Sequence, residues 1–160
     1  MLKHRILFTF GTLYEPTLIS ALLGYEPKNF LAILKDYGVY QGTQNDLSEE
    51  IKEDLKKRRD LTNFTFLFAH KTSPSLHYQM SGKAYYITTK DERIIDCWER
   101  CPKWYRKERV EIEDKDGNKI QAIVYVIDKE GRFLQKYTRV PYELASLIEN
   151  ATKIRKKLRE

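Results

Sequence analysis

A glycine and a small hydroxyl residue stand between an apolar stretch and a helix start in the segment FTFGTLYEP, residues 8–16. Pro16 is favourable at the first position of a helix, so Gly11 and Thr12 lie where a strand passes into a helix. Backbone N–H groups beside a glycine can close around a small anion, and a helix start adds partial positive charge. The segment is therefore a candidate anion-binding turn. The alternative is a tight strand-to-helix turn in which Thr12 is only a local cap.

A second candidate residue is Glu99, in the segment KDERIIDCWERC, residues 90–101. Ile95 and Glu99 are four residues apart, so they share one face of the predicted helix. If Ile95 points into the core, Glu99 points the same way. A carboxylate taken out of water is costly unless it is paired or used. Glu99 is thus a candidate acid/base, and the alternative is a surface glutamate that pairs with Arg100 or Lys103.

The cysteines and histidines do not form a recognisable metal-binding pattern. Cys97 and Cys101 are the two cysteines of the chain, and His4, His70 and His77 are scattered. Two cysteines are too few for a disulfide framework, and a metal site would need further ligands. We therefore expect two ordinary thiols and no metal.

The first half of the chain reads as strands with one early helix. Residues 5–10 alternate as a buried strand does, and the helix that starts at Pro16 ends at Gly24. Residues 29–42 are predicted to be a second strand region, in which Gly38 marks a bulge or a close approach.

A charged helix follows in the segment near 43–77. Asp46 and Glu49 form a cap-like pair before Leu47, Ile51 and Leu55, which are spaced by four. After this helix, alternation predicts a strand over residues 63–70.

The central part of the chain combines a long strand with a short helix. Residues 76–88 are predicted to form two strands or one strand that bends around Gly82. Thr89 and Glu92 make a Thr-x-x-Glu capping box that opens the helix, and Pro102 closes it.

A hairpin and a final helix complete the chain. Residues 106–114 and 120–128 are predicted to pair around the turn DKDGNK, residues 114–119. An apolar stripe then predicts a helix over residues 141–160. Strands dominate and helices surround them, which indicates an α+β fold.

Length and composition favour one globular domain over residues 1–160. The hydrophobic fraction is 41% and the aromatic fraction is 12%. No apolar run approaches the ~20 residues that span a bilayer, so no membrane partner is expected. The apolar start of the chain alternates, is broken by Gly11 and lacks a cleavage pattern, so we expect a cytoplasmic protein.

The net charge of +6, from 29 basic and 23 acidic residues, is compatible with nucleic-acid binding. Much of the excess lies in KEDLKKRRD, residues 52–60, and KIRKKLRE, residues 153–160. Both runs also contain acidic residues, and their apolar residues recur at helical spacing, which favours two solvated helix faces over a nucleic-acid interface.

Three segments together resemble the gamma-glutamylcyclotransferase-like family, which includes plant avirulence-induced proteins. FTFGTL with its Pro-started helix resembles the family's Tyr-Gly-Thr/Ser-Leu signature, and MSGKAYYIT looks like its Gly-x-x-Tyr strand. IIDCWERCPKWYRKERVEI resembles its Leu-Asp-x-x-Glu block, the tyrosine after it and the Arg-x-x-Val strand. The similarity covers residues 5–42 and 78–126.

The resemblance implies a small mixed β-barrel with peripheral helices and a cavity at one end. By position, Gly11, Thr12 and Leu13 correspond to the loop that binds the glutamyl part of a substrate. Glu99 corresponds to the acid/base, and Tyr105 to a residue that lines the pocket. No metal or organic cofactor is implied.

The implied reaction cyclises the glutamyl part of a γ-glutamyl amine, amino acid or peptide to 5-oxoproline and releases the amine. It requires the Glu99 pKa to rise from about 4.3 towards neutrality. Two alternatives remain on the same fold. One is a binding or regulatory module whose basic surface meets a protein or nucleic acid, and the other is a pocket that binds a γ-glutamyl-like metabolite without turnover.

The sequence departs from the family pattern in two places. Phe10 stands where the family usually has tyrosine, and Tyr14 is a candidate replacement for the missing hydroxyl. Residues 43–77, with the charged helix, have no counterpart in the family, and this insertion is expected to cover the cavity or to form a docking surface.

Overall fold

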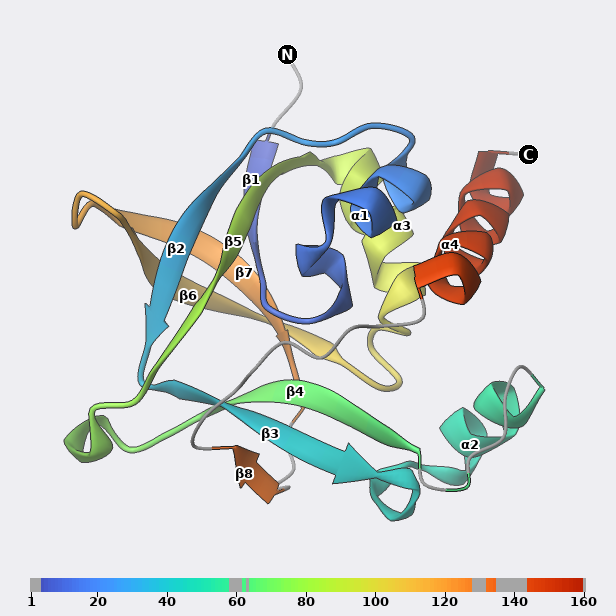
Figure 1. Cartoon of the computed structure of the whole chain (residues 1–160), viewed down its shortest axis with the longest axis horizontal. Coiled ribbons are helices and arrows are strands. Elements are labelled where there is room, and N and C mark those ends of the chain that lie inside the picture. Colours follow the sequence, from blue (N-terminus) through green and yellow to red (C-terminus); the bar gives the residue numbers. More distant parts are fainter. Residues whose placement is uncertain (1–3, 58–61, 63, 128–131, 135–143, 160) are drawn as a thin grey trace.

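Five strands close into a barrel in the computed structural model, which describes residues 4–57, 62, 64–127, 132–134 and 144–159. Neighbouring strands of the barrel pair antiparallel, except that the last pairs parallel with the first through Leu7 and Ile123. Around the barrel the strands are β1 (His4–Thr9), β5 (Gln79–Thr88), β2 (Asn29–Lys35), β6 (Arg106–Asp114) and β7 (Lys119–Val126). The predicted small mixed β-barrel with peripheral helices is confirmed (Figure 1).

Three further strands extend the sheet beyond the barrel. They are β3 (Tyr37–Thr43), β4 (Thr65–Lys71) and β8 (Arg132–Leu134), and β4 joins β7 at one parallel bridge between Ala69 and Val126. Figure 1 shows them crossing one end of the barrel.

The prediction of one strand region over residues 29–42 was wrong in its continuity. Asp36 has a φ of 64° and separates β2 from β3, because aspartate tolerates the left-handed conformation better than most residues. The close approach predicted at Gly38 is confirmed, since a Cβ there would overlap the Phe133 ring.

Alternation along the barrel strands separates two apolar cores. Phe8 and Val124 point into the barrel, whereas their neighbours Leu7 and Ile123 point outwards against the helices. The helices on that outer side are α1 (Pro16–Leu23), α3 (Thr89–Trp98) and α4 (Leu144–Arg159), which lie together on one side of the barrel (Figure 1). The strands buried on both faces therefore read as nearly continuous apolar runs.

The helix starts lie close to their predicted positions, but two caps differ. Thr88 and Asp91 form the capping box of α3, one residue before the predicted pair of Thr89 and Glu92. The extended backbone of Thr88 allows its hydroxyl to accept the N–H of Asp91 at 3.1 Å. Glu92 is buried instead and belongs to an ion network described below.

The insertion contains α2 (Glu49–Lys56), which is capped by Ser48 and not by the predicted pair of Asp46 and Glu49. Asp46 instead accepts the backbone N–H of Thr43 in a separate 3-10 turn. The predicted apolar spacing is confirmed, because Leu47, Ile51 and Leu55 are buried together with Phe64.

The predicted hairpin is confirmed as β6 and β7, which pair in register from Arg106 opposite Val126 to Glu113 opposite Lys119. The final helix is described from Leu144, and its predicted start near Pro141 lies outside the described residues. In the described part of the chain, no helix combines the length and apolar character needed to cross a membrane.

The basic runs are partly neutralised within their own helices. Lys56 lies 3.5 Å from Glu53 and Lys153 lies 3.3 Å from Glu149. Arg58 and Arg59 of the first run lie outside the described residues. These pairs favour solvated helix faces.

Gly82 on β5 leaves no room for a side chain beside β1. A Cβ at Gly82 would collide with the carbonyl oxygen of Thr9 and the ring of Phe8. We expect Gly82→Ala to lower the free energy of unfolding by about 1–3 kcal/mol, because overpacking forces the two strands apart. Urea denaturation measures this change. The neighbouring exposed change Ser81→Ala should stay within about 0.5 kcal/mol of the natural protein, and equal stability of the two variants would contradict the close approach.

Candidate functional site

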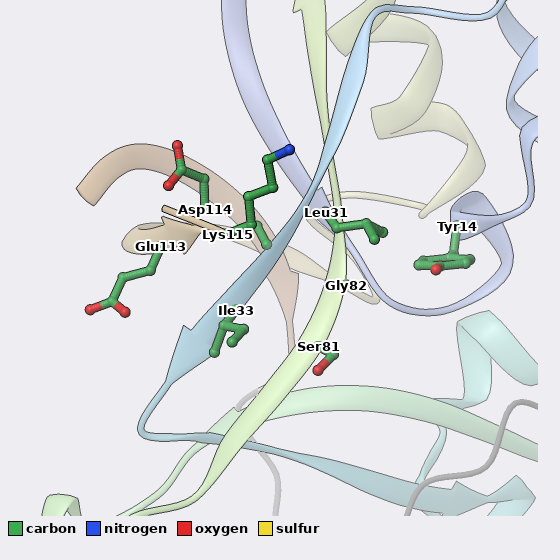
Figure 2. Close-up of a pocket in the computed structure, with 9 residues that line it drawn as sticks. Tyr14, Leu31, Ile33, Ser81, Gly82, Glu113, Asp114 and Lys115 are labelled. Atoms are coloured by element: carbon green, nitrogen blue, oxygen red, sulfur yellow. The ribbon is translucent and has the colours of Figure 1, made fainter. Parts of the chain in front are cut away.

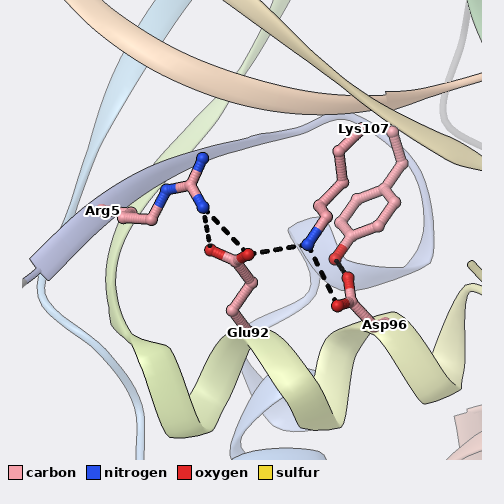
Figure 3. A network of polar contacts seen from close by, with 5 residues as sticks. Arg5, Glu92, Asp96 and Lys107 are labelled. Carbon is pink, nitrogen blue, oxygen red and sulfur yellow. Dashed lines mark hydrogen bonds and ion pairs between the residues drawn. The ribbon is translucent and has the colours of Figure 1, made fainter.

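An ion network fixes the position of α3 against the barrel (Figure 3). Glu92 lies 2.9 Å from an Arg5 guanidinium nitrogen on β1 and 2.7 Å from Lys107 Nζ on β6. The same Lys107 nitrogen lies 3.0 Å from Asp96, which also accepts the hydroxyl of Tyr125 on β7. Three strands of the barrel therefore hold one face of this helix.

The end of α3 is a Schellman turn in which Glu99 is the C-cap residue. The N–H of Cys101 donates to the carbonyl of Asp96 at 2.9 Å, and the N–H of Arg100 donates to the carbonyl of Cys97 at 3.2 Å. Arg100 has a φ of 52°, at the position where this turn usually has glycine. The helix therefore ends abruptly, and the chain turns away from the helix axis at Arg100.

A cavity of about 700 Å³ brings the predicted site residues together. Its lining includes Gly11, Thr12, Leu13, Glu99 and Tyr105. The strand-to-helix turn and the end of α3 also touch directly, because Trp98 Nε1 donates to Thr12 Oγ1 at 3.4 Å. Two segments separated by more than 80 residues thus share one hollow.

The Glu99 carboxyl is partly buried, and this burial raises its pKa to about 7, although nearby Arg100 acts in the opposite direction. The alternative, a surface ion pair between Glu99 and Arg100 or Lys103, is wrong. Arg100 binds Asp54 and Lys103 binds Glu50, and both acids belong to α2. Among the described residues, Glu99 has neither an ion-pair partner nor a hydrogen-bond partner for its carboxyl group.

The turn at Gly11 leaves open space in front of its backbone. Gly11 has a φ of −98°, and a Cβ built on it would meet no atom within 4 Å. The first hydrogen bond of the following 3-10 turn runs from the N–H of Tyr14 to the Gly11 carbonyl at 3.1 Å. The N–H groups of Thr12 and Leu13 precede that bond, so the turn itself gives them no acceptor.

Tyr105 forms part of the cavity wall. Its hydroxyl donates to the carbonyl of Leu67 at 2.8 Å, and its ring is buried. The phenol is therefore oriented by the barrel extension.

Several lining residues were not predicted from the sequence. Tyr125 on β7, whose pKa burial raises, was predicted only as part of a strand, and no role was predicted for Trp104. Asn150 on α4 carried a usable signal, because it lies within the apolar stripe of Leu147 and Ile154 at helical spacing. A polar residue on the core face of a helix indicates a site or a buried hydrogen bond.

A smaller hollow of about 310 Å³ lies elsewhere on the barrel, between Tyr14, the β2–β5 strands and the β6–β7 turn (Figure 2). The Tyr14 ring lies there with Lys83 Nζ 4.5 Å from its centroid. Tyr14 is not among the lining residues of the large cavity, so it does not replace the hydroxyl missing at Phe10. Phe10 itself is buried and lines the large cavity.

The two cysteines lie near the site and do not form a disulfide. Cys97 is exposed, Cys101 is partly buried, and both are free thiols. Within the described ranges, no three His, Cys, Asp or Glu side chains are grouped as metal ligands would be.

Solved structures with this fold include enzymes and plant proteins. A protein named gamma-glutamyl cyclotransferase is 12% identical with a TM-score of 0.60, and the match covers 82% of this chain and 69% of that one. An Arabidopsis thaliana protein known from a solution structure is 15% identical with a TM-score of 0.56, covering 98% and 86%. An AIG2-like protein from Mus musculus is 14% identical with a TM-score of 0.53, covering 88% and 97%. These likenesses establish the fold.

A search of curated proteins gives no match. At the level of families, the gamma-glutamyl cyclotransferase, AIG2-like family matches residues 7–144. This range includes the Gly11 turn, all of α3 and the barrel strands from Leu7 onwards. The chain therefore belongs to the gamma-glutamyl cyclotransferase, AIG2-like family.

Proposed function

We propose that this protein cyclises the glutamyl part of a γ-glutamyl compound to 5-oxoproline, with Glu99 as the acid/base. One observation carries the proposal. Glu99, whose pKa is raised to about 7, lines the same cavity as Gly11, Thr12 and Leu13. Membership of the gamma-glutamyl cyclotransferase, AIG2-like family supports a reaction of this type.

The turn supplies the binding end of the proposed site. The α-carboxylate of the substrate binds the N–H groups of Thr12 and Leu13, because these donors have no acceptor in the turn and an anion suits a helix start. The absent side chain of Gly11 leaves room for that carboxylate. The α-amine and the γ-carbonyl then extend towards Glu99.

The proposed reaction is an intramolecular acyl transfer. The ionised Glu99 takes a proton from the α-ammonium, and the resulting amine attacks the γ-carbonyl carbon. A new C–N bond closes the five-membered ring, and the bond between the γ-carbon and the original amide nitrogen breaks. The two protons lost by the α-ammonium end on the leaving nitrogen, which departs as an ammonium ion, and Glu99 returns to its starting state.

A carboxyl with a pKa near 7 suits both proton transfers. An ordinary glutamate is too weak a base for an ammonium ion, whereas a desolvated one holds a proton more tightly. At neutral pH both protonation states of Glu99 are populated, so the same group can accept a proton and then donate it. Tyr105 contributes a fixed part of the wall of the same cavity.

The first test removes the proton acceptor. We expect Glu99→Gln to reduce the rate of 5-oxoproline release from γ-glutamyl compounds by at least about 10²-fold, because an amide cannot accept the proton. In the natural protein, the rate should fall as the pH decreases through about 7, the pKa of Glu99. Chromatography of 5-oxoproline measures both effects, and the exposed change Glu111→Gln is the control.

The absence of product would contradict the proposed reaction. If the natural protein forms no 5-oxoproline from a panel of γ-glutamyl compounds at near-stoichiometric protein, it is not a cyclotransferase for them. Ligand binding without turnover would then favour a non-catalytic pocket.

A second test needs no substrate. Because the folded-state pKa of Glu99 is about 7 and the ordinary value is 4.5, the folded protein binds more protons than the unfolded chain between these values. The stability contribution of Glu99 therefore falls as the pH rises from 4.5 through 7. Glu99→Gln should gain about 2–3 kcal/mol relative to the natural protein at pH 8, and nothing near pH 4. Urea denaturation at both pH values measures it, and a difference that does not change with pH would show that Glu99 is solvated.

A third test fills the space at the turn. A methyl group at Gly11 meets no protein atom, but the ψ of −133° lies outside the regions that non-glycine residues favour, so Gly11→Ala should fold with a loss of about 1–3 kcal/mol in stability. The methyl group would occupy the place of the α-carboxylate, and we expect KM to rise at least about tenfold. Steady-state kinetics and thermal unfolding of the same sample separate the two effects. An unchanged KM would place the carboxylate elsewhere.

A further inference from the structure

Asn150 is a polar residue on a helix face that is otherwise apolar. It lies between Leu147 and Ile154 at helical spacing, and all three residues line the large cavity. The next residue, Ala151, is fully buried. Withdrawing an amide from water on such a face costs free energy unless the group is hydrogen-bonded. The Asn150 side chain therefore needs a hydrogen-bond partner.

The protein itself supplies no such partner. Within the part of the chain that the structure describes, the Asn150 side chain makes no hydrogen bond. Trp98, Tyr105 and Tyr125 line the same cavity, and each of them donates to an acceptor of the protein. Because Asn150 is only partly buried, its amide is accessible from the cavity. The amide is therefore available to a ligand.

The packing of α4 brings Asn150 to the glutamyl end of the proposed site. α4 packs against α1, which follows the Gly11 turn, and against α3, whose C-cap residue is Glu99 (Figure 1). Leu147, one turn before Asn150, packs against the apolar cluster that contains Leu13 of the turn. The helix that carries Asn150 therefore contacts both elements that hold the glutamyl group in the proposed reaction.

A primary amide matches the head of an α-amino acid. The head has a carboxylate, which accepts hydrogen bonds, and an ammonium group, which donates them. An asparagine side chain has two N–H donors and one carbonyl acceptor, so one amide can bind both groups. The turn offers donors alone, and an ionised Glu99 offers acceptors alone. Asn150 is thus suited to bridge the two charged groups of the head.

We infer that Asn150 determines specificity for the α-amino-acid head of the glutamyl group, with Nδ2 donating to the α-carboxylate and Oδ1 accepting from the α-ammonium. This inference rests on the proposed cyclisation and adds a substrate-binding residue to it. Glu99 removes one proton of the ammonium group while Asn150 holds a second N–H, which orients the nitrogen lone pair towards the γ-carbonyl. The family match ends at residue 144, so this contact comes from a helix beyond the matched range.

A change of similar volume tests whether the amide serves the substrate or the fold. Asn150→Leu removes the donor and the acceptor together. Since the amide has no hydrogen-bond partner among the residues described, the thermal unfolding midpoint should equal or exceed that of the natural protein. A midpoint lowered by more than about 4 °C would reveal a structural hydrogen bond and overturn the inference.

Two ligands that differ by the α-ammonium group test the binding. γ-Glutamyl-methylamide carries this group and glutaryl-methylamide lacks it, and both are titrated calorimetrically into Glu99→Gln, in which turnover is slow. Adding Asn150→Leu should lower the affinity for the γ-glutamyl compound at least about tenfold and for the glutaryl compound about threefold, because two hydrogen bonds are lost in the first case and one in the second. Unchanged affinities would overturn the inference.

A charged variant tests the two contacts separately. Asn150→Asp keeps an acceptor for the ammonium group but places a negative charge beside the α-carboxylate. The glutaryl compound should then lose more affinity than the γ-glutamyl compound, which reverses the order expected for Asn150→Leu. The same order in both variants would overturn the assignment of Nδ2 and Oδ1. Glu149→Gln, at an exposed residue that pairs with Lys153 on the same helix, is the matched control and should change neither affinity.

Kinetics of the natural protein separate failure of this inference from failure of the proposed reaction. Asn150→Leu should lower kcat/KM for 5-oxoproline formation at least about tenfold, whereas Glu149→Gln should leave it unchanged. Cyclisation with an unchanged kcat/KM in Asn150→Leu would overturn the inference and leave the proposed reaction intact. The expected affinity changes without any cyclisation would support the inference and contradict the reaction. The absence of both binding and cyclisation would overturn both.

Discussion

The removal of one carboxyl group from water is the constraint on which the site depends. Burial raises the Glu99 pKa to about 7, and no cation among the described residues pairs with it. Glu92, Asp96 and Glu99 follow one face of α3 at helical spacing, yet only the first two are neutralised, by Arg5 and Lys107. The same helix face therefore anchors α3 to the barrel in its first turns and presents an unpaired acid at its end.

The fold must hold Glu99 in place although burial of its charge is unfavourable. The ion network fixes α3 from three strands, and the Schellman turn stops the helix so that Arg100 is directed towards α2. A non-glycine residue at this left-handed position is unfavourable by itself. Its ion pair with Asp54 offsets part of this cost and also keeps a cation from neutralising Glu99.

The cavity is assembled from residues inside the range that the family matches and from α4 beyond it. The matched residues 7–144 supply the turn, the acid and the barrel wall. Within the same range, residues 43–77 supply Leu55, Phe64 and Phe66, whereas α4, which begins at Leu144, supplies Leu147, Asn150 and Ile154. Parts of the cavity wall therefore lie on segments outside the five strands of the barrel.

The sequence alone determined the elements that depend on neighbours in the chain. Alternation over residues 5–10, the hairpin around Gly117 and the shared face of Ile95 and Glu99 were all readable, because backbone geometry sets their period. Cap positions were displaced by one residue or more, since several adjacent side chains could serve. Tertiary structure alone decided that Asp54 forms an ion pair with Arg100, 46 residues away, and that Tyr14 lines a different hollow from Glu99. Such pairings depend on how the closed barrel brings distant segments together, and the periodicity of the local sequence carries no information about that arrangement.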